Sequence, residues 1–598
     1  MLQIWSVIYF ASILAAVSGL CMIKKSKEKL NFTTEIVFQI LLFMCFQSVC
    51  GWILHLVSLP ISIYTAGFIN IVLGVVCIII SYKKGRQEYY FNYIDILAIV
   101  IIFSVALACG IHQFGDNIDY FNYQSTVDSS RHLQFARQVS INHTLTVDRP
   151  FMAINTGLIF EGLGSFLDSK KDYRWILFVD IYMLFMSGSA FWCLIRSKLK
   201  TKGLIITGII LSVFYMTGYP LNNMVFGTSY LGAGVTVCIL IFALVERYND
   251  GRLSKNYFAF GLPVSLLALI NAYDLFFPII LVGIAVFFGI QILGKQNWVN
   301  GTKKVIILFA LCIGCFMSIC FIFELISQDS PIAHLSTEGY MYNSLFGDYI
   351  FLLPLIMYRL YKCTAERKVT FDYTMCLFLI AYILGLLFAN YIGKVSTYYF
   401  FKTYYVFWMM AFYIVLLDIA ECEGEKREIW YVYASTILLL FIFLYGGLEA
   451  HLEKRSTENG KNLNWELQSD YVFRIYTWNY TRGSTSNNMY NITDDILDLY
   501  DEVSELSETP NNIVQYVGPY EFDHFGFFAM ARQWEENTAY LGDVPSFIDN
   551  ARDKSKYILQ VYSDRVDAPQ ELFDYLDTLK VVYQNNAGRI VEIDKSAY

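Results

Sequence analysis

Charged residues are scarce in this chain of 598 residues. Asp, Glu, Lys and Arg together make up only 16% of it, whereas 56% is hydrophobic. A soluble protein of this length would form several domains, with about a quarter of its residues charged. Apolar runs of about 18 or more residues recur along most of the chain, and such runs are typical of transmembrane helices. We therefore expect a polytopic α-helical membrane protein.

Other absences exclude whole classes of function. All thirteen cysteines lie at or before Cys422, so no disulfide framework holds the loop 113–172 or the residues from 450 onward. The sequence has no phosphate-binding glycine loop, no Gly-x-Ser-x-Gly and no His-Glu-x-x-His motif. It also has no basic stripe or arm that would bind nucleic acid, so we expect no nucleic-acid partner.

We expect about fourteen transmembrane spans, each long enough to cross the hydrocarbon core. The run from 257 to 293 is too long for one helix, and the polar residues at 271–274 divide it at a tight turn. No basic residue precedes the first run and no clear cleavage site follows it, so we expect a retained span and not a signal peptide. The expected spans are 2–23, 33–58, 61–81, 94–112, 173–195, 203–219, 229–246, 257–271, 274–293, 305–326, 347–361, 371–391, 402–419 and 429–447.

Lysine and arginine are unevenly distributed among the loops between these spans. One set of loops is rich in both, and the alternating set has neither. Short loops with many basic residues face the cytoplasm. We therefore expect the N-terminus, the loop 113–172, the turn 392–401 and the residues 450–598 on the outer face. The basic set holds Lys24, Lys25, Lys27, Lys29, Lys83, Lys84, Arg86, Arg196, Lys198, Lys200, Lys202, Arg247, Arg252, Lys255, Lys295, Lys303, Lys304, Arg359, Lys362, Arg367, Lys368, Lys426 and Arg427; the alternating set lies around 59–60, 220–228, 271–274 and 327–346.

The loop 113–172 is the one long polar insertion among the expected spans. An apolar run ends there in Phe114-Gly115-Asp116-Asn117-Ile118-Asp119-Tyr120. Two carboxylates three residues apart can share a metal ion, or one can act as general base while the other positions it. A helix that simply ends in water has the same appearance, so both interpretations stay open.

A helix is expected over 124–139 of this loop. Asp128 and His132 lie four residues apart and so share one face of it. The helix would lie at the membrane interface, where Arg131 and Arg137 either extend toward lipid head groups or are merely solvated. A second apolar segment, 151–166, is expected to be an interfacial or re-entrant element.

Two lysines lie among aromatic residues in the stretch 394–405, which reads Lys-Val-Ser-Thr-Tyr-Tyr-Phe-Phe-Lys-Thr-Tyr-Tyr. Lys394 and Lys402 are among the few basic residues expected on the outer face. Each can bind the phosphate of a lipid carrier as a point charge. An aromatic belt with lysines that extend to the interface is the alternative.

Two acidic residues lie in or beside apolar runs. Asp180 and Asp274 are candidates for function because carboxylates in a membrane are costly. Pairing with a neighbouring helix explains Asp180 equally well, and capping of a turn explains Asp274.

Residues 450–598 alternate between helical and extended patterns. Residues 492–507 have helical periodicity, with Thr493 as a candidate N-cap. Helices between strands predict a small α/β domain, preceded by a loop or linker at 455–490. We therefore divide the chain into a transmembrane domain, 1–449, and a C-terminal domain, 450–598. The expected strands are 512–517, 557–562, 579–583 and 590–593, the last pair joined by a turn at 587–589.

This layout resembles the GT-C class of membrane glycosyltransferases. That class has many spans, a large outer loop with an acidic residue at the outer end of a span, short interfacial helices in that loop and often a soluble C-terminal domain. The resemblance in layout covers the whole chain. In residues it rests on 114–120, on the helix 128–137 and on Ser396-Thr397-Tyr398-Tyr399 with Lys402.

The resemblance implies a donor sugar on polyprenyl phosphate, reached from the plasma membrane, and transfer to an envelope glycan, teichoic acid or protein outside the cytoplasm. It implies an inverting displacement in which Asp116 is the general base. Asp119 would be its partner or, with Mg²⁺ or Mn²⁺ shared by the pair, a metal ligand. The donor phosphate would be held by Arg131, Lys394 and Lys402, and the substrate cleft would be formed by Asp128, His132 and Asp274.

Two alternatives stay open. An envelope polysaccharide polymerase or ligase shares the many spans and the large outer loop. A transporter or flippase of lipid-linked sugars belongs to a different class, in which repeated halves and polar residues at mid-bilayer are common. Here the polar residues gather at the outer face, which favours an enzyme. The abundance of Ile, Asn, Tyr and Lys, with outer parts free of cysteine, favours a bacterial envelope.

Overall fold

The computed structural model describes residues 2–114, 120–122, 128–145, 150–168, 171–294, 353–422, 489–491, 493–506, 513–516, 539–540, 544–562 and 570–593. Within these ranges, ten helical stretches are long and apolar enough to cross a membrane. A helix satisfies its own backbone hydrogen bonds, which is a requirement in hydrocarbon. The chain is therefore a polytopic helical membrane protein, as predicted.

The long helices coincide with the expected spans to within a few residues. The break expected at 271–274 is present, because a 3₁₀ turn at Asp274–Phe276 separates two helices. The expected spans 305–326 and 429–447 lie outside the described residues, so the number fourteen stays a prediction. The helices are α1 (Leu2–Met22), α2 (Phe32–Leu56), α3 (Ile63–Lys84), α4 (Tyr93–Phe114), α7 (Tyr173–Arg196), α8 (Lys202–Met216), α9 (Tyr219–Phe226), α10 (Ser229–Asn249), α11 (Lys255–Tyr273), α12 (Phe277–Gly294), α15 (Leu353–Ala365), α16 (Phe371–Tyr391) and α17 (Thr397–Cys422).

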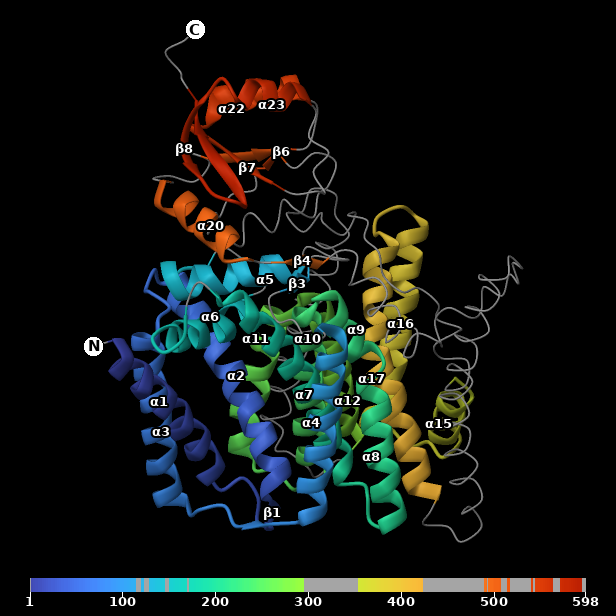
Figure 1. Ribbon diagram of the computed structural model, residues 1–598. Coiled ribbons are helices and arrows are strands. Elements are labelled where there is room, and N and C mark those ends of the chain that lie inside the picture. Colours follow the sequence, from blue (N-terminus) through green and yellow to red (C-terminus); the bar gives the residue numbers. More distant parts are fainter. Residues whose placement is uncertain are drawn as a thin grey trace.

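Those lysine- and arginine-rich loops that the structure describes lie at one end of the helical bundle, here called the basic end. There β1 (Leu30–Asn31) pairs with β2 (Tyr89–Tyr90), and Arg196 Nε lies 2.5 Å from Asp95 Oδ1. The helices of the loop 113–172 lie at the opposite end, here called the loop end (Figure 1). The predicted orientation assigns the loop end to the outer face of the membrane.

Glu35 joins three segments at the basic end. Its carboxylate lies 3.0 Å from Lys25 Nζ and 2.7 Å from Arg247 Nη1, and the side chains of Glu35 and Lys25 are almost fully buried. A buried charge is stable only beside an opposite charge or a set of hydrogen-bond partners. This cluster therefore holds α2, α10 and the segment after α1 in one arrangement.

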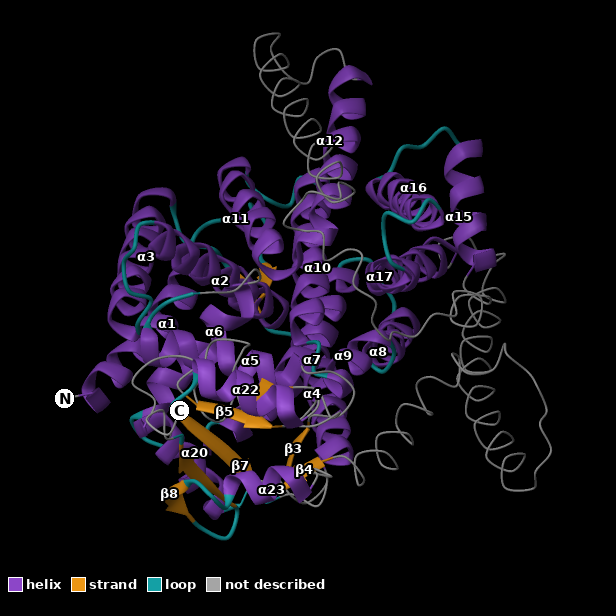
Figure 2. Ribbon diagram, turned by 90° about the horizontal axis from the view of Figure 1, so that it is seen from above, coloured by secondary structure: helices purple, strands orange, loops and turns teal. Residues whose placement is uncertain are grey.

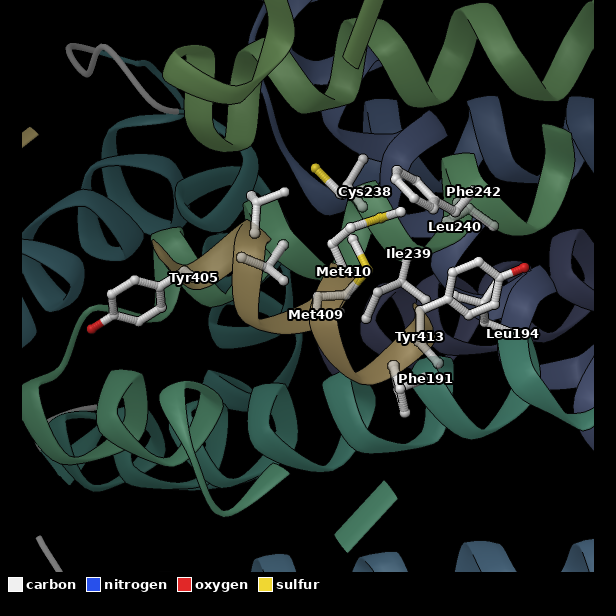
Figure 3. Close-up of a cluster of buried hydrophobic side chains, with 14 of the residues drawn as sticks. Phe191, Leu194, Cys238, Ile239, Leu240, Phe242, Tyr405, Met409, Met410 and Tyr413 are labelled. Carbon is white, nitrogen blue, oxygen red and sulfur yellow. The ribbon is translucent and has the colours of Figure 1, made fainter. Parts of the chain in front are cut away.

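The centre of the bundle is formed by α7, α10 and α17. The most apolar stretch of α10 is completely buried, and that of α17 is 94% buried. Figure 3 shows side chains from these three helices packed together, among them Phe191, Ile239 and Met410. Close packing of this kind fixes the height at which each helix ends.

The loop 113–172 forms helices where the sequence predicts them. α5 (Asp128–Arg137) continues into a π-helix at Gln138–Asn142, and α6 (Pro150–Gly164) follows. Most residues of α6 are buried, since the helix packs against α1, α2 and α11. α6 is thus inserted into the bundle and does not lie on its surface.

Arg137 does not extend toward lipid head groups, contrary to the prediction. It is 2% exposed, and its Nε donates to both carboxylate oxygens of Asp172, at distances of 2.9 and 3.1 Å. The partner lies 35 residues further along the chain, immediately before α7. The pair therefore fastens the end of α5 to the start of a central helix.

The described residues near the C-terminus form a mixed sheet with helices on both faces. The strand order is β6-β5-β7-β9-β8, with β6, β5 and β7 parallel and the other neighbours antiparallel. The expected strands and the expected helix at 492–507 are present. The elements are α20 (Asp494–Leu506), β5 (Ile513–Tyr516), β6 (Ala539–Tyr540), α22 (Val544–Lys554), β7 (Tyr557–Val561), α23 (Gln570–Leu576), β8 (Lys580–Gln584) and β9 (Gly588–Glu592).

This sheet is attached to the loop end through α20. One apolar cluster contains Leu499 and Val503 of α20, Leu133 of α5 and Ile176 of α7. A short antiparallel pair between β3 (Tyr120–Asn122) and β4 (Met489–Asn491) adds a second connection. α22 and α23 cover the other face of the sheet (Figure 1).

Breaking the Arg137–Asp172 pair should destabilise the protein strongly. Asp172→Asn removes the carboxylate charge that is paired with a buried guanidinium, and breaking such a pair costs about 3–5 kcal/mol. Replacement of both partners, in Arg137→Met with Asp172→Leu, should restore most of the loss. Thermal unfolding of the purified protein in detergent measures both effects.

The matched control is Lys29→Ala, which breaks the exposed Lys29–Glu88 pair at the basic end and should change stability by less than about 1 kcal/mol. Equal melting temperatures for Asp172→Asn and this control would contradict the role of the buried pair.

Candidate functional site

A buried lysine lies near the loop end of α17. Lys402 is 2% exposed. Its Nζ lies 5.0 Å from the ring centroid of Tyr399, 5.4 Å from that of Tyr273 and 5.6 Å from that of Tyr230. The ammonium also donates a hydrogen bond of 3.4 Å to the Tyr230 hydroxyl. These four residues are called the lysine cage below.

Three helices bring the cage together. Tyr399 precedes Lys402 by three residues on α17, so the two share a face. Tyr230 is the second residue of α10, and Tyr273 is the last residue of α11. α11 approaches α10 closely at Gly234, where an added Cβ would stand 2.6 Å from the Cβ of Tyr273. Glycine at this position is therefore needed to place the Tyr273 ring.

The rings compensate only part of the cost of burying an ammonium group. A lysine over an aromatic face gains about 0.5–2 kcal/mol, whereas an ion taken out of water loses several kcal/mol of hydration. The Lys402 ammonium is a donor of the kind that binds anionic groups. A phosphate oxygen suits this position, because ammonium to phosphate hydrogen bonds are charge-assisted.

Two further predicted residues lie at or beside the cage. The ring of His132, on α5, lies 5.4 Å from that of Tyr230, and the two planes are inclined by 36°. Asp274 follows Tyr273 directly, and its carboxylate accepts a hydrogen bond of 2.9 Å from the Leu275 N–H. The structure thus gathers Lys402, His132 and Asp274 in one region. Figure 2 shows α5 lying beside α6 and α7 at this end of the bundle.

No contact between the cage and the other predicted residues is described. Lys394 is half-buried in the turn before α17, and none of the described residues forms a hydrogen bond or ion pair with its side chain. Arg131 precedes His132 on α5 and is half-buried. Asp128 begins α5, but its side chain lies outside the described part. Asp116 and Asp119 lie outside the described residues.

The sequence analysis named Tyr399 beside Lys402 but missed Tyr230 and Tyr273 as its neighbours, and it missed a second group of aromatic residues nearby. There the Tyr405 hydroxyl donates to the Asn222 side-chain oxygen, and the Tyr219 ring lies 4.6 Å from that of Tyr405. A tyrosine directly before the polar residue Asp274 was the available signal for Tyr273. Nothing in the local sequence indicates that Tyr230 faces Lys402, because the two are 172 residues apart.

No group of three or more His, Cys, Asp or Glu side chains that could hold a metal ion occurs among the described residues. This finding leaves the predicted metal role of Asp116 and Asp119 untested. No protein-family model matches the chain, and no curated protein matches it in a sequence comparison.

A second polar contact at the loop end involves Glu161 of α6. Its Oε2 accepts a hydrogen bond of 2.9 Å from the N–H of Ile63, at the start of α3, and lies 3.8 Å from His143 Nδ1. The His143 carbonyl accepts a hydrogen bond from the Ile61 N–H. Burial raises the pKa of Glu161 to about 7, although the hydrogen bond from Ile63 favours the ionised form. The connection between α2 and α3 is thus held by a titrating group.

Glu161 should make the protein less stable as the pH rises from about 5 to about 8, because the folded state holds this proton more tightly than the unfolded state does. Glu161→Gln keeps an acceptor for the Ile63 N–H and cannot ionise. The variant should match the unaltered protein near pH 5 and melt at a higher temperature near pH 8. Thermal unfolding at several pH values measures the difference.

The control is Glu366→Gln, at an exposed position of the basic end. It should leave the pH dependence of the melting temperature unchanged. If the Glu161→Gln variant loses stability with pH as steeply as the unaltered protein, Glu161 is not the group responsible.

Proposed function

We propose that this protein is an integral-membrane glycosyltransferase of the GT-C class. It moves a sugar from a polyprenyl-phosphate donor to an envelope glycan, a teichoic acid or a protein on the outer face of the plasma membrane. The observation that supports this most is the lysine cage, a buried cation at the loop end beneath a helix of the large loop. A lipid-borne phosphate is an anion that reaches such a position from within the bilayer.

Lys402 binds the donor phosphate and stabilises the charge that develops on it as the sugar departs. His132 and Asp274, beside the cage, contribute to the substrate cleft with Asp128. Arg131 and Lys394 supply further positive charge as the donor enters. An ammonium held by packed rings is already oriented, so little reorganisation is needed during the reaction.

Asp116 is the general base that takes the proton of the acceptor hydroxyl, and Asp119 is its partner or a metal ligand. The support for this assignment comes from the flanking elements. α4 ends at Phe114, β3 begins at Tyr120, and α4 starts at the basic end, where Asp95 pairs with Arg196. The chain on both sides of the two carboxylates therefore belongs to the loop end.

Lys402→Met should reduce glycan transfer by about tenfold to a hundredfold, because it removes a charge-assisted hydrogen bond to phosphate while keeping an unbranched side chain in the cage. Mass spectrometry of envelope glycans from cells that carry each variant measures the transfer. Lys83→Met, at an exposed position of the basic end, is the control and should have no effect.

Full transfer by the Lys402→Met variant, with unaltered amounts of protein in the membrane, would contradict the role of the cage in phosphate binding.

Asp116→Asn should abolish transfer without lowering the amount of folded protein, because the amide cannot accept the acceptor proton. The same glycan measurement and a thermal unfolding curve test both parts. Unchanged glycans would remove Asp116 as the base.

A second candidate is a transporter of lipid-linked sugars, which the buried carboxylate of Asp180 within α7 favours. Movement of a labelled polyprenyl-phosphate sugar across proteoliposomes distinguishes the two. A transporter would retain this movement after Asp116→Asn, whereas the proposed enzyme would show none before or after the change.

A further inference from the structure

A small pocket lies between α7, α9 and α10, toward the loop end. Its polar lining comes from Asp180, Ser187, Asn223 and Ser229, and Gly232 forms part of its wall. Asp180 is the eighth residue of α7, so it lies about 10 Å along the helix from the loop end. The pocket is therefore inside the membrane-spanning part of the bundle.

Asp180 differs from the other buried carboxylates of the spans. Glu35, Asp95 and Asp372 each lie within 3.0 Å of a lysine or arginine nitrogen. Asp180 is 5% exposed, and no lysine or arginine of the described residues forms an ion pair with it. Its hydrogen-bond partner is the Ser229 hydroxyl. One neutral donor does not balance a full negative charge.

The N-terminus of α10 compensates a further part of the Asp180 charge. Ser229 is the first residue of this helix of 21 residues, and a helix N-terminus is equivalent to about half a positive charge. Roughly half of the carboxylate charge therefore remains to be balanced. Either a proton or a cation beside Asp180 would balance it.

The surroundings of Asp180 favour a cation over a proton. Ser187 and Ser229 present hydroxyl oxygens at the same pocket, whereas the Asn223 amide oxygen already accepts a hydrogen bond from the Thr228 hydroxyl. The Ser187 hydroxyl lies 3.0 Å from the Tyr215 hydroxyl, which can donate to it and leave a lone pair for a further partner. Hard cations bind such sets of carboxylate and hydroxyl oxygens.

We propose that this pocket binds a small monovalent cation, sodium, with Asp180 as its charged ligand. The pocket is narrow, because a Cβ added at Gly232 would stand 3.4 Å from Asn223 Nδ2. A narrow site favours the smaller of the common monovalent ions. The bound ion links α7 to the α9–α10 junction, one residue before Tyr230 of the lysine cage. The inference does not depend on glycosyl transfer, since a cation there would stabilise the bundle in any case.

The test compares thermal unfolding of the full-length protein in detergent in sodium, potassium and choline chloride at equal concentration. Sodium should raise the melting temperature by about 1–3 °C relative to choline, because an ion that binds only the folded state stabilises that state. Potassium should have a smaller effect. Identical melting temperatures in sodium and choline overturn the proposal, and equal stabilisation by potassium overturns the assignment to sodium.

Two variants test whether the sodium-dependent shift in melting temperature arises at this pocket. Asp180→Asn removes the charge, and Gly232→Ala fills the space while it favours the helical conformation of α10. Both should lose the sodium-dependent shift. Asp172→Asn, at a buried carboxylate that is paired with Arg137, is the matched control and should retain the shift despite its lower stability. A sodium shift that persists in both pocket variants places the ion elsewhere and overturns the proposal.

Discussion

Compensation of buried charge is the constraint on which this structure depends. In the low dielectric of a membrane bundle, a charge is stable only beside an opposite charge, a set of polar partners or a proton. At the basic end ion pairs meet this condition: Glu35 lies between Lys25 and Arg247, and Arg359 contacts Asp372, Asp418 and Glu421. These pairs fix how far each helix is shifted along its neighbours. The pairs thus constrain α2 against α10, and α15 against α16 and α17.

At the loop end the buried Arg137–Asp172 pair meets the same condition, and two other buried charges have different surroundings. Lys402 lies among three tyrosine rings, and Asp180 lies at a helix N-terminus with one hydroxyl donor. Ring faces and helix ends carry fractional charge, so they compensate a unit charge only in part. At Asp180, incomplete compensation would raise the affinity for a cation.

The sequence predicted elements well and contacts between distant elements poorly. Apolar run length located the spans, and a polar cluster located the break between α11 and α12, because both signals are local. The prediction for Arg137 was wrong because its partner, Asp172, lies beyond α6, and no periodic pattern connects them. Lys402 was singled out from its aromatic neighbours in sequence, but two of its three ring contacts come from α10 and α11. Helix packing determines which side chains from distant segments come together, and no local sequence pattern indicates it.

A layer of packed aromatic side chains lies between the cage and the basic end. Below Lys402 along α17, Trp408 donates a hydrogen bond to the Tyr215 carbonyl of α8, and its ring lies 4.7 Å from that of Phe412. The Tyr215 ring is stacked on Phe191 of α7 at 4.3 Å. A phosphate held at the cage has this aromatic layer between itself and the basic end. Passage toward the basic end would require α7, α8 and α17 to separate, as alternating access does in transporters. A reaction completed at the loop end requires no such separation, because donor lipid, acceptor and cage meet on one side of the layer. The tightly packed layer therefore favours chemistry at one face over movement through the bundle.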